Sequence, residues 1–229
     1  MEKQNIHIAV DAVVLGYHNR QMHVLLIKRK FGDFKGRWAL PGGFVEENEG
    51  IRDAIIRELK EETSVQIGYL EQLYTFGDNI YRDPRGRVIS ISYFALVNSS
   101  QIQPSADTDA EDARWFPLHD LPLLAFDHQE IIQYAKKRLK NKITYQPIGF
   151  DLLDSKFTFS ELEQLYVSIA GKDIDRRNFR KKILSLGILT ETRQMIQPKT
   201  GRPAKLYQFN KSRYEQLKHN GFHFDISFT

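Results

Sequence analysis

The sequence predicts an α+β chain of two domains, and three observations support this prediction. Its 229 residues are more than one average domain needs and suit two modest domains. Alternating apolar stretches, typical of strands, flank amphipathic helical patterns in the first part of the chain. Basic residues gather in the last third, after the pattern lapses around Pro147. We therefore expect one domain over residues 1–145 and a second over residues 146–229.

Composition excludes several classes of protein. Hydrophobic residues make up 41% of the chain and charged residues 27%, as in folded globular proteins rather than disordered or fibrous ones. The absence of cysteine excludes disulfide bonds, thiolate metal sites and cysteine nucleophiles. The sequence shows no signal segment and no apolar stretch long enough to span a membrane, so we expect a cytoplasmic protein with no membrane partner.

The first domain opens with a predicted hairpin, because apolar stretches at residues 6–17 and 22–30 flank the polar sequence HNRQ. A glycine-containing loop at residues 36–49 then leads into a predicted amphipathic helix at residues 50–63. The apolar residues of that helix recur at helical spacing: Ile51, Ala54, Ile55 and Leu59.

Two further strands and a second helix complete the first domain. Residues 87–97 are rich in β-branched and aromatic residues, which favour a strand, and a short strand is expected at residues 113–118. Asp127 and Glu130 have the spacing of a capping box, and apolar residues then continue at helical spacing to Leu139. We expect this helix to close the first domain.

A carboxylate-rich motif lies between Gly43 and Val65. Glu58, Glu61 and Glu62 stand at helical offsets of zero, three and four, so their carboxylates project from one helix face. Such hard oxygen donors suit Mg²⁺, and Mg²⁺ suits a diphosphate substrate attacked by metal-activated water. We therefore predict that Glu58, Glu61 and Glu62 bind Mg²⁺ and take part in catalysis.

Two further residues belong to this motif. Arg57 is placed to hold Glu49 and to orient the carboxylates, so both are included among the catalytic residues. The alternative is that the run RELKEET is an exposed charged helix face without chemistry. A catalytic base outside the helix cannot be assigned, and Glu111 and Asp112 are only weak choices for it.

The spacing of the motif resembles a known family. A glycine, five residues, Glu49, seven residues and the run RELKEE match the Nudix box of Nudix hydrolases, and the preceding WALPGGF is also typical of that family. Ser64 departs from the pattern, since the family usually has glycine at this position. The resemblance implies an α/β/α sandwich with a mixed sheet.

Features outside the box resemble the Nudix proteins that handle ADP-ribose, on the sequences YRDPRGRVISISYFALV and DARWFPLHDLPLLAFDHQEII. Arginines in the first of these are able to pair with phosphate, although an ordinary solvated loop has the same composition. The expected ligand-binding residues are Arg82, Arg85, Arg87 and Gly43.

The second domain has the pattern of a winged helix-turn-helix. A capping box at Ser160 and Glu163 predicts one helix, and a basic helix at residues 175–186 follows after a short turn. The sequences ILTET and KLYQFN then predict two strands that bracket a basic tip. The sequence leaves open whether the apolar residues of the C-terminal tail pack on their own domain or on a partner subunit.

The second domain also carries the basic charge. Residues 147–229 contain 14 Lys and Arg against 9 Asp and Glu, whereas the whole chain has 33 against 29. This favours a polyanion partner, although a solvated basic face is the alternative. Arg180→Ala is expected to weaken operator binding by about 1–3 kcal/mol if Arg180 reads a base. The expected DNA-contacting residues are Arg176, Arg177, Asn178, Arg180, Lys181 and Lys182 in the basic helix, and Lys199, Thr200, Arg202 and Lys205 at the wing.

The combination of the two domains resembles the Nudix-related transcriptional regulators, bacterial repressors of NAD-metabolism genes. That resemblance implies a homodimer that binds double-stranded operator DNA and senses ADP-ribose, although relatives respond to other sugars or sugar derivatives. The alternative is an active Mg²⁺-dependent ADP-ribose pyrophosphatase, because all three carboxylates are retained. A hydrolase of damaged nucleotides would leave the second domain without a role.

Overall fold

The computed structural model describes residues 5–63, 67–101, 110–197 and 202–228. The chain divides into two compact units, Met1–Lys137 and Arg138–Thr229. We call them unit 1 and unit 2 and describe each by itself. Ser64, Lys199 and Thr200, which the sequence analysis singled out, lie outside the described residues.

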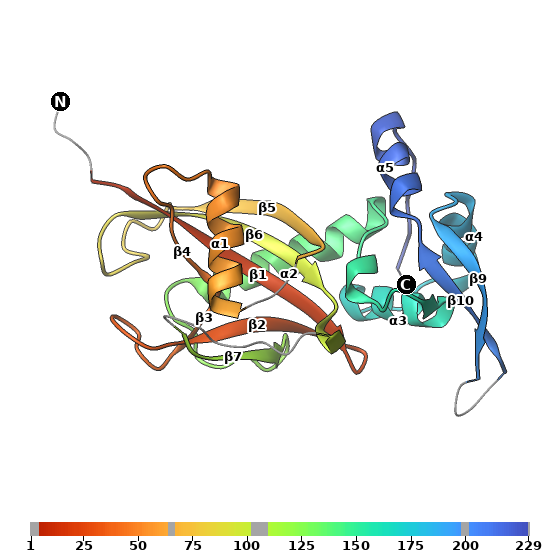
Figure 1. Cartoon of the computed structure of the whole chain (residues 1–229), viewed down its shortest axis with the longest axis horizontal. Coiled ribbons are helices and arrows are strands. Elements are labelled where there is room, and N and C mark those ends of the chain that lie inside the picture. Colours follow the sequence, from red (N-terminus) through yellow and green to blue (C-terminus); the bar gives the residue numbers. More distant parts are fainter. Residues whose placement is uncertain (1–4, 64–66, 102–109, 198–201, 229) are drawn as a thin grey trace. The chain divides into compact units, whose positions relative to one another are not determined.

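Unit 1 is built on a mixed sheet, as predicted (Figure 1). Its main path has the strand order β3-β2-β1-β6-β5, with β4 paired to β1 and β7 paired to β2. The central strands β1 and β6 pair in parallel, and the other pairs are antiparallel. The strands are β1 (His7–His18), β2 (Gln21–Arg29), β3 (Trp38–Ala39), β4 (Gly42–Phe44), β5 (Tyr69–Phe76), β6 (Val88–Val97) and β7 (Ala110–Pro117), and the short helix η1 (Ser99–Gln101) follows β6.

Helices cover the sheet on both faces, which confirms the predicted α/β/α sandwich. Figure 1 shows α1 (Ile51–Thr63) in front of the sheet and the first part of α2 (His128–Tyr145) behind it. Alternate residues of β1 face α1, so Val10, Ala12 and Val14 share one core cluster with Ile55 and Leu59. Both helices and all four strands predicted for the first domain are present, whereas β3, β4 and β5 were not predicted.

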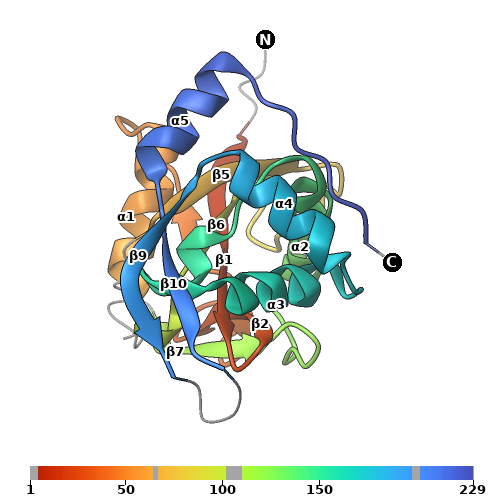
Figure 2. The ribbon, with the colours of Figure 1, turned by 90° about the vertical axis from the view of Figure 1, so that its right-hand side faces the viewer.

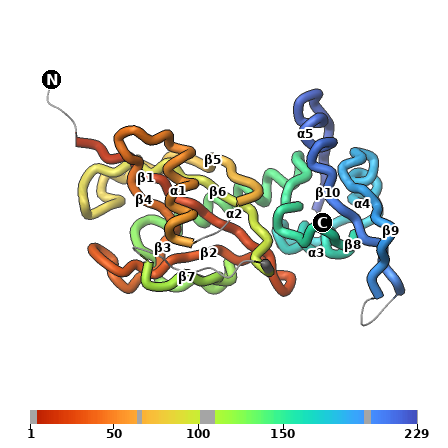
Figure 3. Tube along the Cα trace, viewed as in Figure 1, coloured from red at the N-terminus to blue at the C-terminus, as the bar shows by residue number. Residues whose placement is uncertain are grey.

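Unit 2 is a winged helix, which confirms the predicted fold. Strand β8 comes first, helices α3 and α4 follow, and β9 and β10 complete a three-stranded sheet of order β8-β10-β9, with β9 and β10 side by side as the wing (Figures 2 and 3). Helix α5 and the short elements η2 and β8 were not predicted. The elements are η2 (Phe150–Leu152), β8 (Phe157–Thr158), α3 (Phe159–Ala170), α4 (Arg176–Ser185), β9 (Leu189–Ile196), β10 (Ala204–Phe209) and α5 (Lys211–Asn220).

The predicted capping box at Ser160 and Glu163 is wrong by two residues. The box is formed by Thr158 and Glu161: the Thr158 side chain accepts a bond from the Glu161 amide, and the Glu161 carboxylate accepts one from the Thr158 amide. Both pairs have the same spacing, but Thr158 is the residue with the extended backbone that an N-cap requires. Helix α3 therefore begins at Phe159.

The C-terminal tail packs on its own unit, which is one of the two possibilities left open by the sequence. Phe224 and Ile226 are 4% and 5% exposed within this single chain. The Ile226 amide donates to the Thr144 carbonyl at 2.9 Å. Across the described residues, no helix combines the length and the apolar character needed to cross a bilayer.

Candidate effector site and nucleic-acid interface

Arg57 lies at the centre of the carboxylate cluster on α1. Its Nε and Nη2 atoms donate to the two carboxylate oxygens of Glu49, at 2.8 and 2.9 Å. Its Nη1 atom donates to Glu58 Oε1 at 2.8 Å and to Glu61 Oε2 at 3.3 Å. One guanidinium therefore joins three acidic residues, and the contact expected between Arg57 and Glu49 is present.

The electrostatics of this cluster differ from one carboxylate to the next. The bidentate bond from Arg57 holds the pKa of Glu49 below its ordinary value. Burial raises the pKa of Glu58, and the opposing effect of Arg57 does not cancel it. Glu58 is thus a partly desolvated carboxylate, and additional positive charge beside it would stabilise its ionised form.

Two glycines of β4 bring backbone against these carboxylates. The Gly42 amide donates to Glu62 Oε2 at 2.8 Å, and a Cβ atom on Gly42 would lie 2.1 Å from the Val10 carbonyl oxygen. A Cβ atom on Gly43 would lie 2.2 Å from Glu58 Oε1. Only glycine therefore leaves room for Glu58 to lie against the loop, which places the predicted ligand residue Gly43 beside the cluster.

Two of the three predicted metal ligands face a hollow. Glu58 and Glu62 line it with Arg29, Phe44 and Arg85, and it measures about 670 Å³ with its open solvent included. Glu61 does not line this hollow, and in the part of the chain that the structure describes no three acidic or histidine side chains converge as a preformed metal site. The hard oxygen donors still fit Mg²⁺ in their chemistry.

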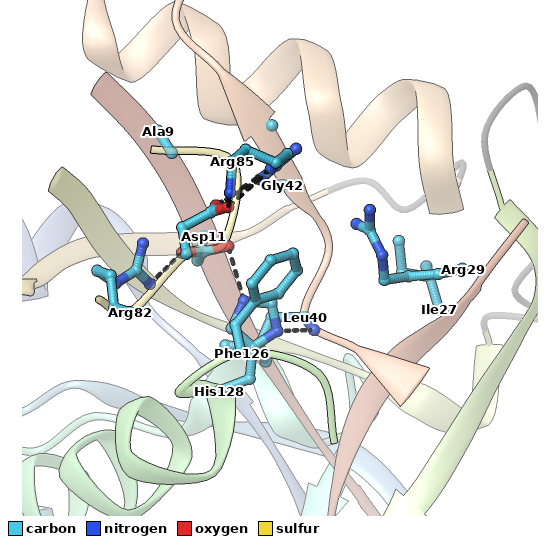
Figure 4. A pocket seen from close by; sticks show the side chains of 12 residues that line it. Ala9, Asp11, Ile27, Arg29, Leu40, Gly42, Arg82, Arg85, Phe126 and His128 are labelled. Atoms are coloured by element: carbon cyan, nitrogen blue, oxygen red, sulfur yellow. Dashed lines mark hydrogen bonds and ion pairs between the residues drawn. The ribbon is translucent and has the colours of Figure 1, made fainter. Parts of the chain in front are cut away.

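A second hollow adjoins the first and shares Arg29, Gly42, Gly43 and Arg85 with it. Figure 4 shows its wall of charged side chains, with Arg82 beside Asp11. The Arg82 guanidinium lies 3.6 Å from Asp11 Oδ2. It also donates to both oxygens of Asp127, at 2.7 and 2.6 Å. The side chain of Arg82 is only 3% exposed. The predicted ligand residue Arg82 thus lines the hollow while its charge is paired inside the protein.

His128 connects the same network to the backbone. The Leu40 amide donates to His128 Nδ1 at 2.8 Å, so that nitrogen carries no proton. The ring proton is therefore on Nε2, which lies 3.3 Å from Asp11 Oδ1. Burial alone would raise the pKa of Asp11, but the interactions with His128, Arg82 and Ser90 outweigh it and hold that pKa at about 2.

The remaining predicted ligand residues have different surroundings. Arg85 lines both hollows, pairs with Asp83 at 2.7 Å, and its guanidinium carbon lies 4.6 Å from the centre of the Phe44 ring. Arg87 lines neither hollow, because its Nη1 atom donates to the Gly77 carbonyl at 2.6 Å. Arg85 is therefore a wall residue with a partly exposed charge, whereas Arg87 lies outside the site.

Glu111 and Asp112 lie on β7 and line neither hollow. Their carboxylates pair with Lys28 and Arg114 respectively. The sequence analysis missed Asp11 and His128, although a charged residue inside the apolar run IHIAVDAVVLGY is a signal that marks Asp11.

Helix α4 of unit 2 presents the predicted DNA-contacting residues. Asp175 caps it by accepting from the Asn178 amide at 3.1 Å, and Phe179 and Ile183 are its buried residues. Arg177 and Lys181 are exposed and make no ion pair within the described part of the chain. Arg176 is also exposed and lies on the same helix.

Other residues of the predicted interface are held by neighbours. Arg180 donates from Nη2 to the Tyr207 hydroxyl at 3.1 Å, and its guanidinium carbon lies 4.4 Å from the centre of the Phe159 ring. Lys182 donates to the Asp225 carbonyl. On the wing, Lys205 pairs with Glu191 at 2.6 Å and Arg202 is exposed.

The NUDIX domain family matches residues 5–135, and the NrtR DNA-binding winged helix domain matches residues 149–209. The chain is 37% identical over 213 residues to the ADPR responsive transcriptional repressor NtrR of Acinetobacter baylyi, with 91% of this chain and 84% of that protein covered.

Solved structures give the same result. The crystal structure of Shewanella oneidensis NrtR complexed with a 27mer DNA matches with a TM-score of 0.84 and 34% identity, over 96% of this chain and 99% of that chain. The NUDIX domain of the same protein, complexed with ADP ribose, matches with a TM-score of 0.56 and 39% identity, over 60% and 90%. By sequence and by structure, the chain belongs to the NrtR family, in which a NUDIX domain is joined to a DNA-binding winged helix domain.

Proposed function

We propose that this chain is a transcriptional repressor that binds double-stranded operator DNA through unit 2 and senses ADP-ribose through its NUDIX domain. The observation that carries the proposal is the near full-length similarity to a DNA-bound NrtR, together with the exposed basic face of α4. A hydrolase needs no such winged helix. The protein acts as a homodimer in this proposal, since helix-turn-helix proteins usually read two-fold operators.

In unit 2 the first turn of α4 is the base-reading part. Arg176, Arg177 and Asn178 lie there, as in helix-turn-helix proteins whose recognition helix contacts base edges with its N-terminal residues. Lys181 contacts phosphate, and Arg202 on the wing contacts the adjacent groove. Arg180 supports the interface, because its guanidinium is already bonded to Tyr207.

In unit 1 the two adjoining hollows form the effector site. Arg29 and Arg85 line both of them and present guanidinium groups that suit a diphosphate. Asp11, ionised at neutral pH because its pKa is about 2, is a suitable acceptor for ribose hydroxyl groups. The charges of this site are fixed by internal pairing before a ligand arrives, which lowers the cost of ordering it.

An electrophoretic mobility shift tests the repressor proposal. The chain is titrated onto DNA from upstream of its own gene, at fixed salt, in chelator, with and without ADP-ribose. We expect sequence-specific binding that changes on addition of ADP-ribose, and we expect Arg177→Ala to weaken it. Specific and scrambled duplexes bound equally by the wild-type chain would contradict the proposal.

Metal-dependent hydrolysis of ADP-ribose is the second function that the site supports. The observation in its favour is that Glu58 and Glu62 face the hollow. These two carboxylates would hold Mg²⁺, with Arg57 orienting Glu58. When bound, Mg²⁺ supplies charge to the diphosphate and lowers the pKa of an attacking water.

Hydrolysis is tested by following AMP release from ADP-ribose in the presence of Mg²⁺ or of chelator. An active enzyme should lose turnover in chelator and in Glu58→Gln, whose carboxylate is replaced by an amide of the same shape. Arg114→Met serves as the control, because this side chain lines neither hollow and is 65% exposed. Absence of AMP release from the wild-type chain would leave the NUDIX domain with sensing alone.

A further inference from the structure

Residues 221–228 form an extended segment that we call the C-terminal strap. Its side chains alternate between inward and outward positions. His223, Asp225 and Ser227 are exposed, whereas Phe224 and Ile226 are buried. Such alternation of apolar and polar residues is what an extended segment shows when one face packs on a core. The strap lies beyond residues 149–209, the part matched by the winged helix family.

The strap is tied to the last turn of α2. Ile226 donates its amide hydrogen to the Thr144 carbonyl at 2.9 Å. Helix α2 ends at Tyr145, so this carbonyl is one of the terminal groups that lack a partner within the helix. Nearby, Phe222 packs against Tyr214. The strap therefore fixes itself to α2 by a backbone bond that does not depend on side-chain identity.

The strap also contacts α4 near both of its ends. Phe228 forms an antiparallel bridge with Ile174, directly before the N-cap residue Asp175. Lys182, in the last turn of α4, donates its ammonium group to the Asp225 carbonyl. Figure 2 shows the tail running from α5 past α4.

Helix α4 needs an external support of this kind. It has ten residues, and only Phe179 and Ile183 of its side chains are buried. Helices this short are marginal on their own, and their stability comes from tertiary packing. Base reading in the major groove depends on the position of the whole helix, whereas attraction to phosphates tolerates small displacements.

We propose that the C-terminal strap positions the recognition helix α4 for base reading by holding both of its ends to the last turn of α2. The proposal rests on the DNA-binding function proposed above for unit 2. Phe224 and Ile226 anchor the strap and act through α4, so they are positioning residues and do not touch DNA.

The test compares inward-facing and outward-facing substitutions in the full-length chain. The inward variant is Phe224→Ala/Ile226→Ala, and the matched control is His223→Ala/Ser227→Ala on the exposed face. The probes are a duplex selected by the wild-type chain from a random-sequence library and a scrambled duplex of equal length, at one salt concentration. The measured quantity is the dissociation constant of the scrambled duplex divided by that of the selected duplex.

The inward variant is expected to lower this ratio about tenfold, mainly through weaker binding of the selected duplex. The outward control is expected to keep the wild-type ratio. The conservative variant Phe224→Leu/Ile226→Val should restore most of it. A general loss of folded protein would weaken binding to both duplexes equally, so the variants are first compared by circular dichroism. An unchanged ratio in an inward variant that is folded would overturn the proposal.

Hydrogen exchange provides the second measurement. Faster exchange of the α4 amides in the inward variant, with α3 unchanged, is the expected result, and unchanged α4 protection would contradict the strap's role. If the double variant does not fold, Ile226→Ala alone is measured in its place. If the wild-type chain selects no sequence at all, the DNA-binding function itself fails, which is distinct from failure of the strap alone.

Discussion

Arg57 and Arg82 of unit 1 differ from Arg177 and Lys181 of α4 in how their charges are surrounded. In unit 1, Arg57 and Arg82 each bond to two or more carboxylates, and Arg82 is almost completely buried. In unit 2, Arg177 and Lys181 are exposed and make no ion pair with any described residue. Charge is satisfied internally in one region and left in water in the other.

This difference shows what each region is suited to bind. Desolvating a charge is costly, so the buried charges of unit 1 persist only because partners compensate them, and the result is a site of fixed geometry for a small ligand. The exposed charges of α4 pay no such cost and are free to replace the counterions of a polyanion. Substitution should therefore affect stability in unit 1 and DNA binding in unit 2.

The largest effect is expected from Arg82→Met. Removing this guanidinium takes away the bonding partner of the half-buried Asp127 and one of the charges that offset the buried Asp11, which should lower the free energy of unfolding of unit 1 by about 3–5 kcal/mol. Urea denaturation measures this loss. Arg114→Met removes the partner of Asp112 in an exposed pair and should cost less than about 1 kcal/mol. Equal losses in the two variants would refute the contrast between buried and exposed charge.

The second effect concerns acid. The pKa of Asp11 is about 2 in the folded chain against an ordinary value of 3.8, so the unfolded chain binds more protons between these values. The contribution of this group is present above pH 4, and about 2 kcal/mol of stability is lost as the pH falls through the folded pKa. Urea denaturation at several pH values should show a shallower decline in Asp11→Asn than in the wild-type chain. An identical slope would show that Asp11 does not titrate in this way.

A smaller effect is expected on DNA binding, without loss of stability. Arg177→Ala should weaken binding to the selected duplex by about 1–3 kcal/mol and relax sequence preference if the residue reads a base. Fluorescence anisotropy titrations measure this change, and urea denaturation should show wild-type stability. A large loss of stability in this variant would break the comparison, because the charge would then be structural.

The smallest effect is expected from Lys181→Ala. Loss of an exposed lysine that contacts a phosphate should weaken binding of the selected and scrambled duplexes alike, by less than about 1 kcal/mol. It should also reduce the salt dependence of binding by roughly one counterion. Titrations at three salt concentrations measure the slope. The assigned roles would be reversed if Lys181→Ala lost discrimination between the two duplexes while Arg177→Ala retained it.

Much of the fold was predictable because its signals are local. The hairpin, the strands at residues 87–97 and 113–118, and helix α1 follow from apolar periodicity that each segment carries within itself. Strand β5 was missed because only Leu73 and Phe76 of its eight residues are buried, so its sequence YLEQLYTF lacks clean alternation. The short strands β3 and β4 exist only through pairing with β2 and β1.

The functional residues also divide into those that local spacing predicts and those that only contacts between distant segments bring together. The carboxylates of α1 and the basic residues of α4 were predicted from the sequence, because residues three and four apart on a helix share a face whatever surrounds it. Spacing, charge and residue type along the chain therefore fix the fold class, the carboxylate helix and the basic recognition helix. Contacts between distant segments are different, because no local pattern encodes which partner a side chain will meet. Folding alone brings Arg82 to Asp127 rather than to a ligand, pairs His128 with Asp11, and lays the C-terminal strap along α4.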